Sequence, residues 1–143
     1  MRKNSAYHTY NIPKGVYGEV SKIKEEILEF IDAEKQGDLI LQMCELSDIY
    51  GAFEGYIEKH HKKTNISEIF AKITRPRYCE CGKDLLDEYI KCFEENEPHL
   101  FWLANFGATL AELLDHPLYL NFEIEDLKKF SDKTKATKSI EVI

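Results

Sequence analysis

The amino-acid sequence predicts an all-α protein built as a helical bundle. Only 7 glycines and 4 prolines occur in 143 residues, so long segments contain no helix breaker. Apolar residues recur at intervals of three and four along most of the chain, which is the period of an amphipathic helix. The composition is 43% hydrophobic and 31% charged, which excludes global disorder and fits one domain with a sizeable core.

The first predicted helix covers residues 16–35. Its apolar stripe has a helical period, and the turn Gln36-Gly37-Asp38 ends it. Glu26 and Glu29 lie beside the stripe and project from one side of the helix, because i,i+3 residues are neighbours on a helix surface. The stripe consists of Val16, Val20, Ile23, Ile27, Phe30 and Ile31.

The second predicted helix covers residues 38–60. Its core stripe consists of Leu39, Met43, Leu46, Tyr50, Phe53 and Ile57. Glu45 and Asp48 lie on the opposite side, again with i,i+3 spacing. Their neighbours on that side are small or apolar: Leu41, Cys44, Gly51, Ala52 and Gly55. Such neighbours are atypical of a solvated face, so another helix is expected to pack closely against these two acids.

Four more helices are predicted beyond residue 60. The first opens at a capping box formed by Asn65 and Glu68. Pro98 stands in a helix-opening position, and Asp115-His116-Pro117 breaks the helix that follows it. The four helices are expected at residues 65–74, 83–95, 98–114 and 123–135.

Charge and hydropathy exclude several classes of protein. The net charge is −7, from 26 acids and 19 bases, which argues against a general nucleic-acid-binding surface. No apolar run approaches the ~20 residues that a membrane span needs. The first residues contain no apolar segment of a secretion signal, and four cysteines without such a signal favour a reducing cytoplasm. A cytoplasmic protein is therefore expected.

The two acid pairs predict a metal site. Neither Glu26/Glu29 nor Glu45/Asp48 has an obvious basic partner in register on its own helix. Where two such helices cross, four acids would repel and raise one another's pKa unless a cation lies among them. Mg²⁺ binds a few carboxylates, keeps several waters and accepts substrate phosphates, so it is the expected ion.

The alternative interpretation of the acids is a solvated acidic face supported by Lys22 and Lys24. Pairs within a helix contribute only about 0.2–0.5 kcal/mol each. That is too little to explain acids placed among residues such as Cys44 and Ala52. The neighbouring Glu25 is expected on the surface, outside the site.

Residues 15–60 resemble the MazG-type, all-α nucleoside triphosphate pyrophosphohydrolases, and the small phage-borne members most. The resemblance is carried by residues 15–29 and 45–59, which contain E-x-x-E and E-x-x-D separated by a spacer of residues 30–44. Residues 122–134 resemble the helix that closes those small proteins.

The resemblance implies a four-helix bundle interrupted by a helical insertion. Residues 1–61 would form the N-terminal part of the MazG-like core with both acidic motifs. Residues 62–118 would be the insertion, expected as a separate helical layer without a metal ligand. Residues 119–143 would supply the C-terminal core helix and the tail.

The activity that the resemblance implies is Mg²⁺-dependent cleavage of a (deoxy)nucleoside triphosphate into a monophosphate and pyrophosphate, with Mn²⁺ as a second ion. Glu26, Glu29, Glu45 and Asp48 would be the metal ligands. Glu29, with Glu26 beside it, is the candidate catalytic residue that orients or deprotonates the attacking water.

Four further residues are candidates for substrate binding. Lys22 falls on the same side of the first helix as the acids, where a base can contact phosphate. His8, Tyr10 and Tyr17 precede that helix, where a nucleobase could stack.

Partners and alternatives follow from the same resemblance. These folds normally form dimers or larger assemblies, because two helix pairs must cover one another's apolar faces, so a homo-oligomer (dimer or tetramer) is expected.

The tail at 135–139 lacks the Gly and Arg expected after the closing helix. The alternative function is therefore a catalytically weak or inactive nucleotide-binding or protein-binding module acting through residues 62–118. Within that insertion, Phe101, Trp102 and Phe106 are expected in the core, with a partner surface as the alternative.

A third interpretation is a zinc-stabilised helical adaptor. Cys79 and Cys81 resemble half of a zinc knuckle. The remaining ligands would have to come from Cys92, His99 or His116. No second closely spaced cysteine pair exists in the sequence, so free thiols in a turn are the expected state.

Overall fold

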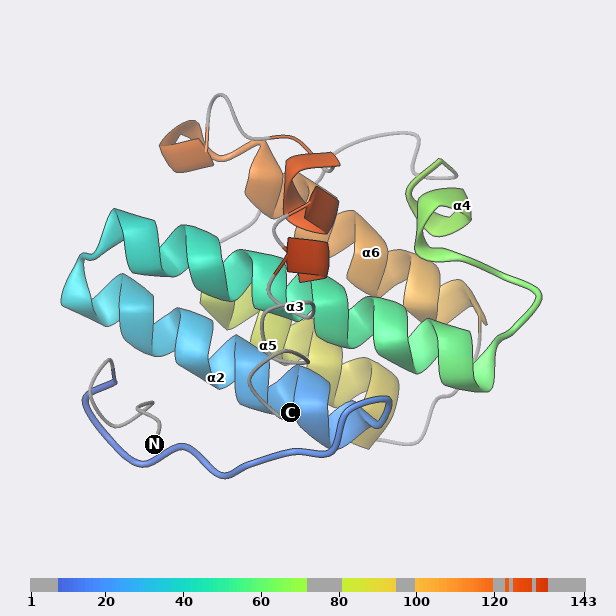
Figure 1. Cartoon of the computed structure of the whole chain (residues 1–143), viewed down its shortest axis with the longest axis horizontal. Helices are drawn as coiled ribbons and strands as arrows, with labels where there is room; N and C mark the ends of the chain where they lie inside the picture. The colour runs from blue at the N-terminus through green and yellow to red at the C-terminus, as the bar shows by residue number, and fades with distance from the viewer. Residues whose placement is uncertain are drawn as a thin grey trace.

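Two long antiparallel helices form the centre of the molecule. The computed structural model describes residues 8–71, 81–94, 100–119, 123, 125–129 and 131–133. In these residues the regular structure is helical and contains no strand, which confirms the all-α class. Helix α2 (Val20–Gln36) and helix α3 (Leu39–His60) lie side by side along their lengths (Figure 1).

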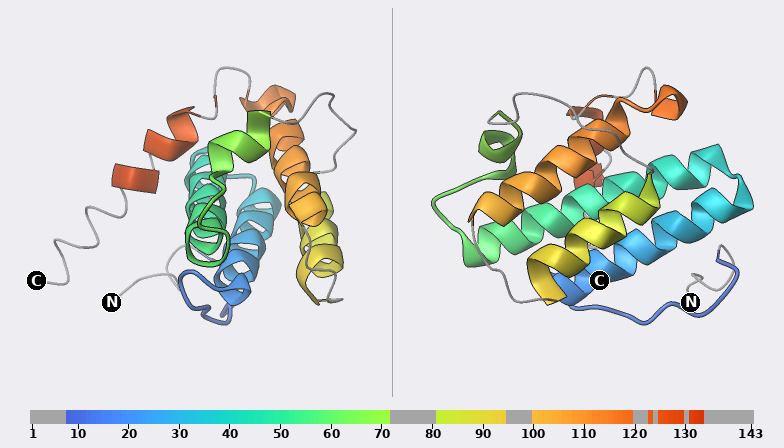
Figure 2. Two further views of the ribbon diagram at one scale, coloured as in Figure 1. Left: turned by 90° about the vertical axis from the view of Figure 1, so that its right-hand side faces the viewer. Right: turned by 180° about the vertical axis from the view of Figure 1, so that it is seen from behind.

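The other helices cover two faces of this pair. Helix α5 (Gly82–Tyr89), continued by the π-helical turn η1 (Ile90–Glu94), packs against α2, and α6 (Leu100–Leu114) packs beside α5. Helix α4 (Ile66–Ala71) contacts α6 and the end of α3. The helical residues 125–129 and 131–133 lie on the opposite side of the pair (Figure 2). None of the helices in the described part of the chain combines the length and apolar composition of a membrane span.

The turn between α2 and α3 forms as the sequence predicts. Gly37 ends α2 with a left-handed φ of 71°, and its N–H is donated to the carbonyl of Glu34. Asp38 then caps α3, because its side chain accepts the backbone N–H of Leu41 at 3.0 Å. This short connection makes the two helices antiparallel neighbours.

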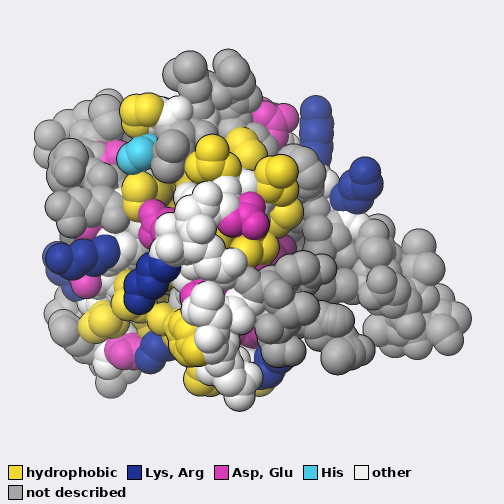
Figure 3. Space-filling model, turned by 90° about the vertical axis from the view of Figure 1, so that its left-hand side faces the viewer, with side chains coloured by type: hydrophobic (Ala, Val, Ile, Leu, Met, Phe, Trp, Pro, Cys, Tyr) yellow, Lys and Arg dark blue, Asp and Glu magenta, His cyan; other side chains and the backbone are white. Residues whose placement is uncertain are grey.

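The start of each apolar stripe differs from the prediction. Helix α2 begins at Val20, so the predicted start at residue 16 is wrong, and Val16 is 62% exposed. Leu39 is 49% exposed and the adjacent Ile40 is 77% exposed, so Leu39 is not a core residue. On the face that includes the α2–α3 turn, hydrophobic and acidic side chains lie next to each other at the surface (Figure 3).

Most of the remaining predicted stripe forms the core, together with Ile49, which was not predicted, whereas Val20, Ile31 and Met43 are only partly buried. The fully buried side chains from α2 and α3 are Ile23, Ile27, Phe30, Leu46, Ile49, Tyr50, Phe53 and Ile57. Phe106 of α6 is also fully buried, with its ring centroid 4.7 Å from that of Phe53. It is therefore a core residue as expected, whereas the side chains of Phe101 and Trp102 lie outside the described part of the structure.

The helix start and stop signals predicted beyond residue 60 act as expected at α4 and α6. Both hydrogen bonds of the capping box form, with Glu68 N–H donating to Asn65 Oδ1 at 2.8 Å and Asn65 N–H to Glu68 Oε1 at 3.3 Å. Helix α6 ends before Asp115, as predicted. The single helix expected at 83–95 is instead α5 followed by η1. The end predicted at residue 74 for the helix that is now α4 lies outside the described residues, as does the tail after residue 134.

Helix α5 approaches α2 closely through Gly82. A Cβ atom at this position would lie 2.6 Å from both Ile31 Cγ1 and Glu34 Oε1, and 3.2 Å from Phe30 Cδ2. Gly82 N–H is donated to Glu34 Oε1 at 3.1 Å, which fastens the start of α5 to α2. The packing of this layer therefore depends on the absence of a side chain at Gly82.

We expect Gly82→Ala to lower the free energy of unfolding by about 1–3 kcal/mol, the usual cost of overpacking a core. Gly55→Ala is the matched control. Its Cβ would meet the Tyr17 ring, at 2.5 Å from Cζ, but Tyr17 is half exposed and can move aside. Urea denaturation measures both variants. Equal losses in the two would contradict the close packing of α5 on α2.

Candidate metal centre

Four acids converge where α2 crosses α3. Glu26 and Glu29 come from α2, and Glu45 and Asp48 come from α3. One carboxylate oxygen from each residue lies within 4.8 Å of those from the other three. Glu26, Glu29 and Glu45 are buried, and Asp48 is partly buried. The structure thus brings together the four residues predicted as metal ligands, and this group is called the acidic cluster below.

Two oxygens of the acidic cluster have no hydrogen-bond partner. They are Oε1 of Glu26 and Oε1 of Glu45, and both are buried. A buried polar atom without a partner costs about 1–3 kcal/mol, and more when it is charged. The acidic cluster is therefore unfavourable as a purely structural feature, and a cation or protons would compensate it.

Protons compensate part of this charge when no metal is bound. Burial raises the pKa of Glu45, and the charges of Asp48, Glu29 and Glu26 raise it further. Burial and the charge of Glu26 likewise raise the pKa of Glu29 to about 8. Metal binding would displace such protons.

One lysine contacts the acidic cluster. Lys22 Nζ lies 2.9 Å from Glu26 Oε2 and 3.0 Å from Glu25 Oε1. The expectation that neither acid pair has a basic partner on its own helix is therefore wrong for Glu26. Lys24 instead pairs with Glu94, at 2.7 Å. Among the contacts that the described residues show, Lys22 offsets part of this charge. The acids are mostly buried, and one oxygen each of Glu26 and Glu45 stays without a hydrogen-bond partner, which argues against the interpretation as a solvated face.

Glu25 is buried, so its expected surface position is wrong. Its Oε1 accepts the backbone N–H of Gly15 at 2.9 Å as well as the lysine proton, and Lys14 lies 3.7 Å from its Oε2. Burial opposes ionisation, but the Gly15 N–H and Lys22 lower the pKa of Glu25 overall. Glu25 therefore holds the chain that precedes α2, and it stands outside the acidic cluster.

Residues 8–19, the N-terminal segment, run along α2 and reach the acidic cluster (Figure 1). Thr9 donates both its backbone N–H, at 2.9 Å, and its hydroxyl to Asp32. At the other end of the segment, His60 Nε2 lies 3.1 Å from the carbonyl oxygen of Gly18. These contacts fasten the segment across the outer side of the helix pair.

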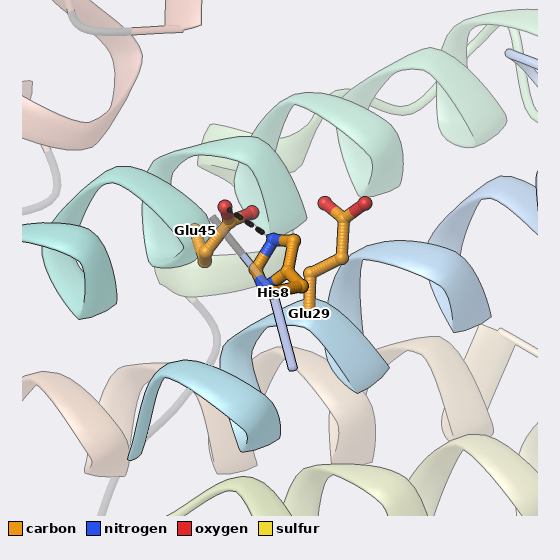
Figure 4. A group of neighbouring side chains, drawn as sticks. All are labelled: His8, Glu29 and Glu45. Atoms are coloured by element: carbon orange, nitrogen blue, oxygen red, sulfur yellow. Dashed lines mark ion pairs between the residues drawn. The ribbon is translucent and has the colours of Figure 1, made fainter. Parts of the chain in front are cut away.

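His8 lies against the acids rather than open to a nucleobase (Figure 4). Its Nδ1 lies 3.0 Å from Asp32 Oδ2, and its Nε2 lies 3.3 Å from Glu45 Oε2. The ring is buried. Sequence reasoning missed Asp32, although this residue continues the i,i+3 row of Glu26 and Glu29 along α2.

The two tyrosines lie beside the acidic cluster's helices with accessible rings. Tyr17 is 51% exposed and packs on Gly55 of α3, a residue on the same face as Asp48 two turns earlier. Among the described residues, the face of α3 around the acids is covered by α2, which is the helix expected to pack there, and by the N-terminal segment. Tyr10 is also about half exposed.

The zinc interpretation gains no support. Cys79 and His99 lie outside the described residues. Cys81 precedes α5 with a positive φ of 61°, and Cys92 is buried in the core. Within the described ranges, the groups with metal-binding geometry contain His8 and the acidic cluster only, with no cysteine and no residue of the predicted insertion.

Comparison with family models, with curated proteins and with solved structures gives no match for this chain. The resemblance to MazG-type enzymes consequently stays a prediction from the two motifs.

We expect the metal-free protein to become less stable as pH rises. A group whose pKa is higher in the folded than in the unfolded protein contributes its whole stabilisation below the unfolded pKa, which is about 4.3 for glutamate. This contribution is lost as the pH rises from that value through the folded pKa. For Glu29 that loss extends to about pH 8. Unfolding in urea with EDTA, at pH 6 and pH 8, should show it.

Glu29→Gln is the matched variant for this test, since it removes the titrating acid. Its comparison with the wild type also cancels the contribution of His61, whose pKa burial and His60 lower. Parallel pH profiles for the two proteins would contradict the assigned shift.

Proposed function

We propose that this protein is a Mg²⁺-dependent nucleoside triphosphate pyrophosphohydrolase of the MazG type. The observation that carries the proposal is the acidic cluster, in which four carboxylates from two helices meet and leave two buried oxygens unpartnered. Carboxylate oxygens are the ligands that Mg²⁺ prefers. The residues present therefore fit this ion.

Bound Mg²⁺ would supply charge neutralisation for the triphosphate and a more acidic water for attack. Glu29 is the proposed general base. It would take a proton from the attacking water as the oxygen bonds to the α-phosphorus and the bond to the bridging oxygen breaks, releasing pyrophosphate. A carboxylate oxygen of Glu29 that the ion does not engage would be the acceptor of that proton.

Other residues would position the nucleotide. Lys22 borders the acidic cluster at Glu26 and retains partial exposure, so its ammonium can lie near substrate phosphates. Tyr17 and Tyr10 offer half-exposed rings for a base. The exposed Leu39 and Ile40 support the proposed homo-oligomer, since a second copy would remove these side chains from water.

We expect Glu45→Gln and Asp48→Asn to lower kcat/KM for (d)NTP hydrolysis by more than about 100-fold, because loss of even an outer partner of a metal costs 10–100-fold. Pyrophosphate release from a panel of eight (d)NTPs with Mg²⁺ measures this. Both variants should remain folded without metal, because each replacement keeps the size of the side chain and removes a titrating acid from the acidic cluster.

Glu58→Gln is the control, because Glu58 lies on the same helix but is exposed. Unchanged turnover in the Glu45 and Asp48 variants would remove these residues from catalysis. A wild-type protein that binds Mg²⁺ and nucleotide without releasing pyrophosphate would favour the binding-module alternative.

We also expect Mg²⁺ or Mn²⁺ to raise the melting temperature. Binding to the folded state alone adds about 2.7 kcal/mol at 100 times Kd, which corresponds to roughly 5–10 °C for a domain of this size. A nucleotide should raise it further. The shift should vanish in the double variant Glu26→Gln/Glu45→Gln, and a melting curve indifferent to both EDTA and Mg²⁺ would contradict a metal site.

A further inference from the structure

A second group of ligand atoms adjoins the acidic cluster. One ring nitrogen of His8, with one oxygen each from Glu29 and Glu45, forms a set whose atoms lie within 4.8 Å of one another. The nitrogen that faces Glu45 is Nε2, at 3.3 Å from Glu45 Oε2. All three residues are buried. This set shares two carboxylates with the acidic cluster, so the two groups form one continuous site with a nitrogen donor at one end (Figure 4).

Asp32 holds the imidazole in this orientation. Four donors reach its carboxylate: the Thr9 N–H at 2.9 Å, the Thr9 hydroxyl, the Gln36 amide at 2.9 Å and His8 Nδ1 at 3.0 Å. The Thr9 N–H and the Gln36 amide can only donate, so the Asp32 carboxylate is the acceptor in these contacts. The Nδ1 proton is then donated to Asp32, and in the neutral ring the lone pair is on Nε2.

A metal-binding histidine usually donates its other ring N–H to a carboxylate, which fixes the orientation of the ring. Asp32 has this relation to His8. Here the other nitrogen faces Glu45, whose second oxygen is buried without a partner. This oxygen is an observation independent of the charge of the cluster. It indicates that the space between His8 and the acids suits a cation.

We propose that His8 is a metal ligand through Nε2, and that with Glu29 and Glu45 it forms a second cation position beside that of the acidic cluster. Mg²⁺ is held almost entirely by oxygen, whereas first-row transition ions also accept imidazole. This position therefore selects an ion such as Mn²⁺ over Mg²⁺. The inference rests on the metal centre of the proposed function, and it does not require nucleotide hydrolysis.

The test is a titration of the full chain with Mn²⁺ followed by electron paramagnetic resonance. The free-ion signal gives affinity and stoichiometry, and pulsed spectra detect coupling to ¹⁴N. We expect imidazole nitrogen coupling in the wild type, its loss in His8→Ala, and Mn²⁺ affinity at least about 10-fold weaker in that variant. His116→Ala is the matched control, since His116 belongs to neither group of ligand atoms, and it should leave both readouts unchanged.

Asp32→Asn tests the positioning role separately. The ligand nitrogen remains in this variant, so ¹⁴N coupling should persist while Mn²⁺ affinity falls by about 10–100-fold, as for loss of an outer-shell partner. Circular dichroism establishes that each variant is folded. His8 is buried but does not belong to the hydrophobic core cluster, so its replacement removes no apolar core side chain.

Several results would overturn the inference. Mn²⁺ bound without nitrogen coupling would show that His8 is not a ligand. Tighter Mn²⁺ binding by His8→Ala would show that the imidazole competes with the ion. Absence of Mn²⁺ binding would overturn both this inference and the proposed function.

The two proposals can also fail separately. Nitrogen-coupled Mn²⁺ without pyrophosphate release would support the ligand role of His8 and overturn the hydrolase assignment. Mg²⁺-dependent pyrophosphate release by a protein whose bound Mn²⁺ shows no nitrogen coupling would support the hydrolase assignment and overturn the ligand role of His8.

Discussion

The structure depends on the contact between α2 and α3, which buries apolar side chains and acids at the same time. On the core side of the contact, residues such as Ile27 and Phe53 are fully removed from water. Beside them, Glu29 and Glu45 are buried with their carboxyl groups close to each other. Full burial of a large apolar side chain is worth roughly 1.5–3 kcal/mol, and several such residues together offset the cost of the acids. The helix pair can therefore hold an unfavourable cluster in place.

The surrounding residues moderate this cost without removing it. Lys22 contacts one edge of the acidic cluster, and His8 contacts the other. The N-terminal segment carries His8, and Asp32 fixes the segment through Thr9. Since these groups leave two buried carboxylate oxygens without partners, the arrangement has the character of a binding site and not of a stabilising ion-pair network.

The layer of α5 and α6 has a different role. It covers the face of α2 and α3 that carries Phe30 and Phe53, through close contacts at Gly82 and Phe106. Among the described residues, none from this layer enters the groups of metal-binding atoms. The α2–α3 pair therefore packs its apolar core against α5 and α6 on one face and carries the acidic cluster on another face.

Local sequence determined the helices, the Gly37-Asp38 turn, the capping box of α4 and the i,i+3 placement of Glu26 with Glu29 and of Glu45 with Asp48. Each of these follows from spacing within a few residues, and the helix period makes such spacing readable. The partners of these residues were decided by tertiary structure alone. His8 reaches Asp32 and Glu45 across 24 and 37 positions because an extended segment folds back over α2, and no periodicity reports where such a segment lies. The exposure of Val16 and Leu39 was missed for the same reason, since burial depends on which surfaces meet and not on the order of residues within one helix.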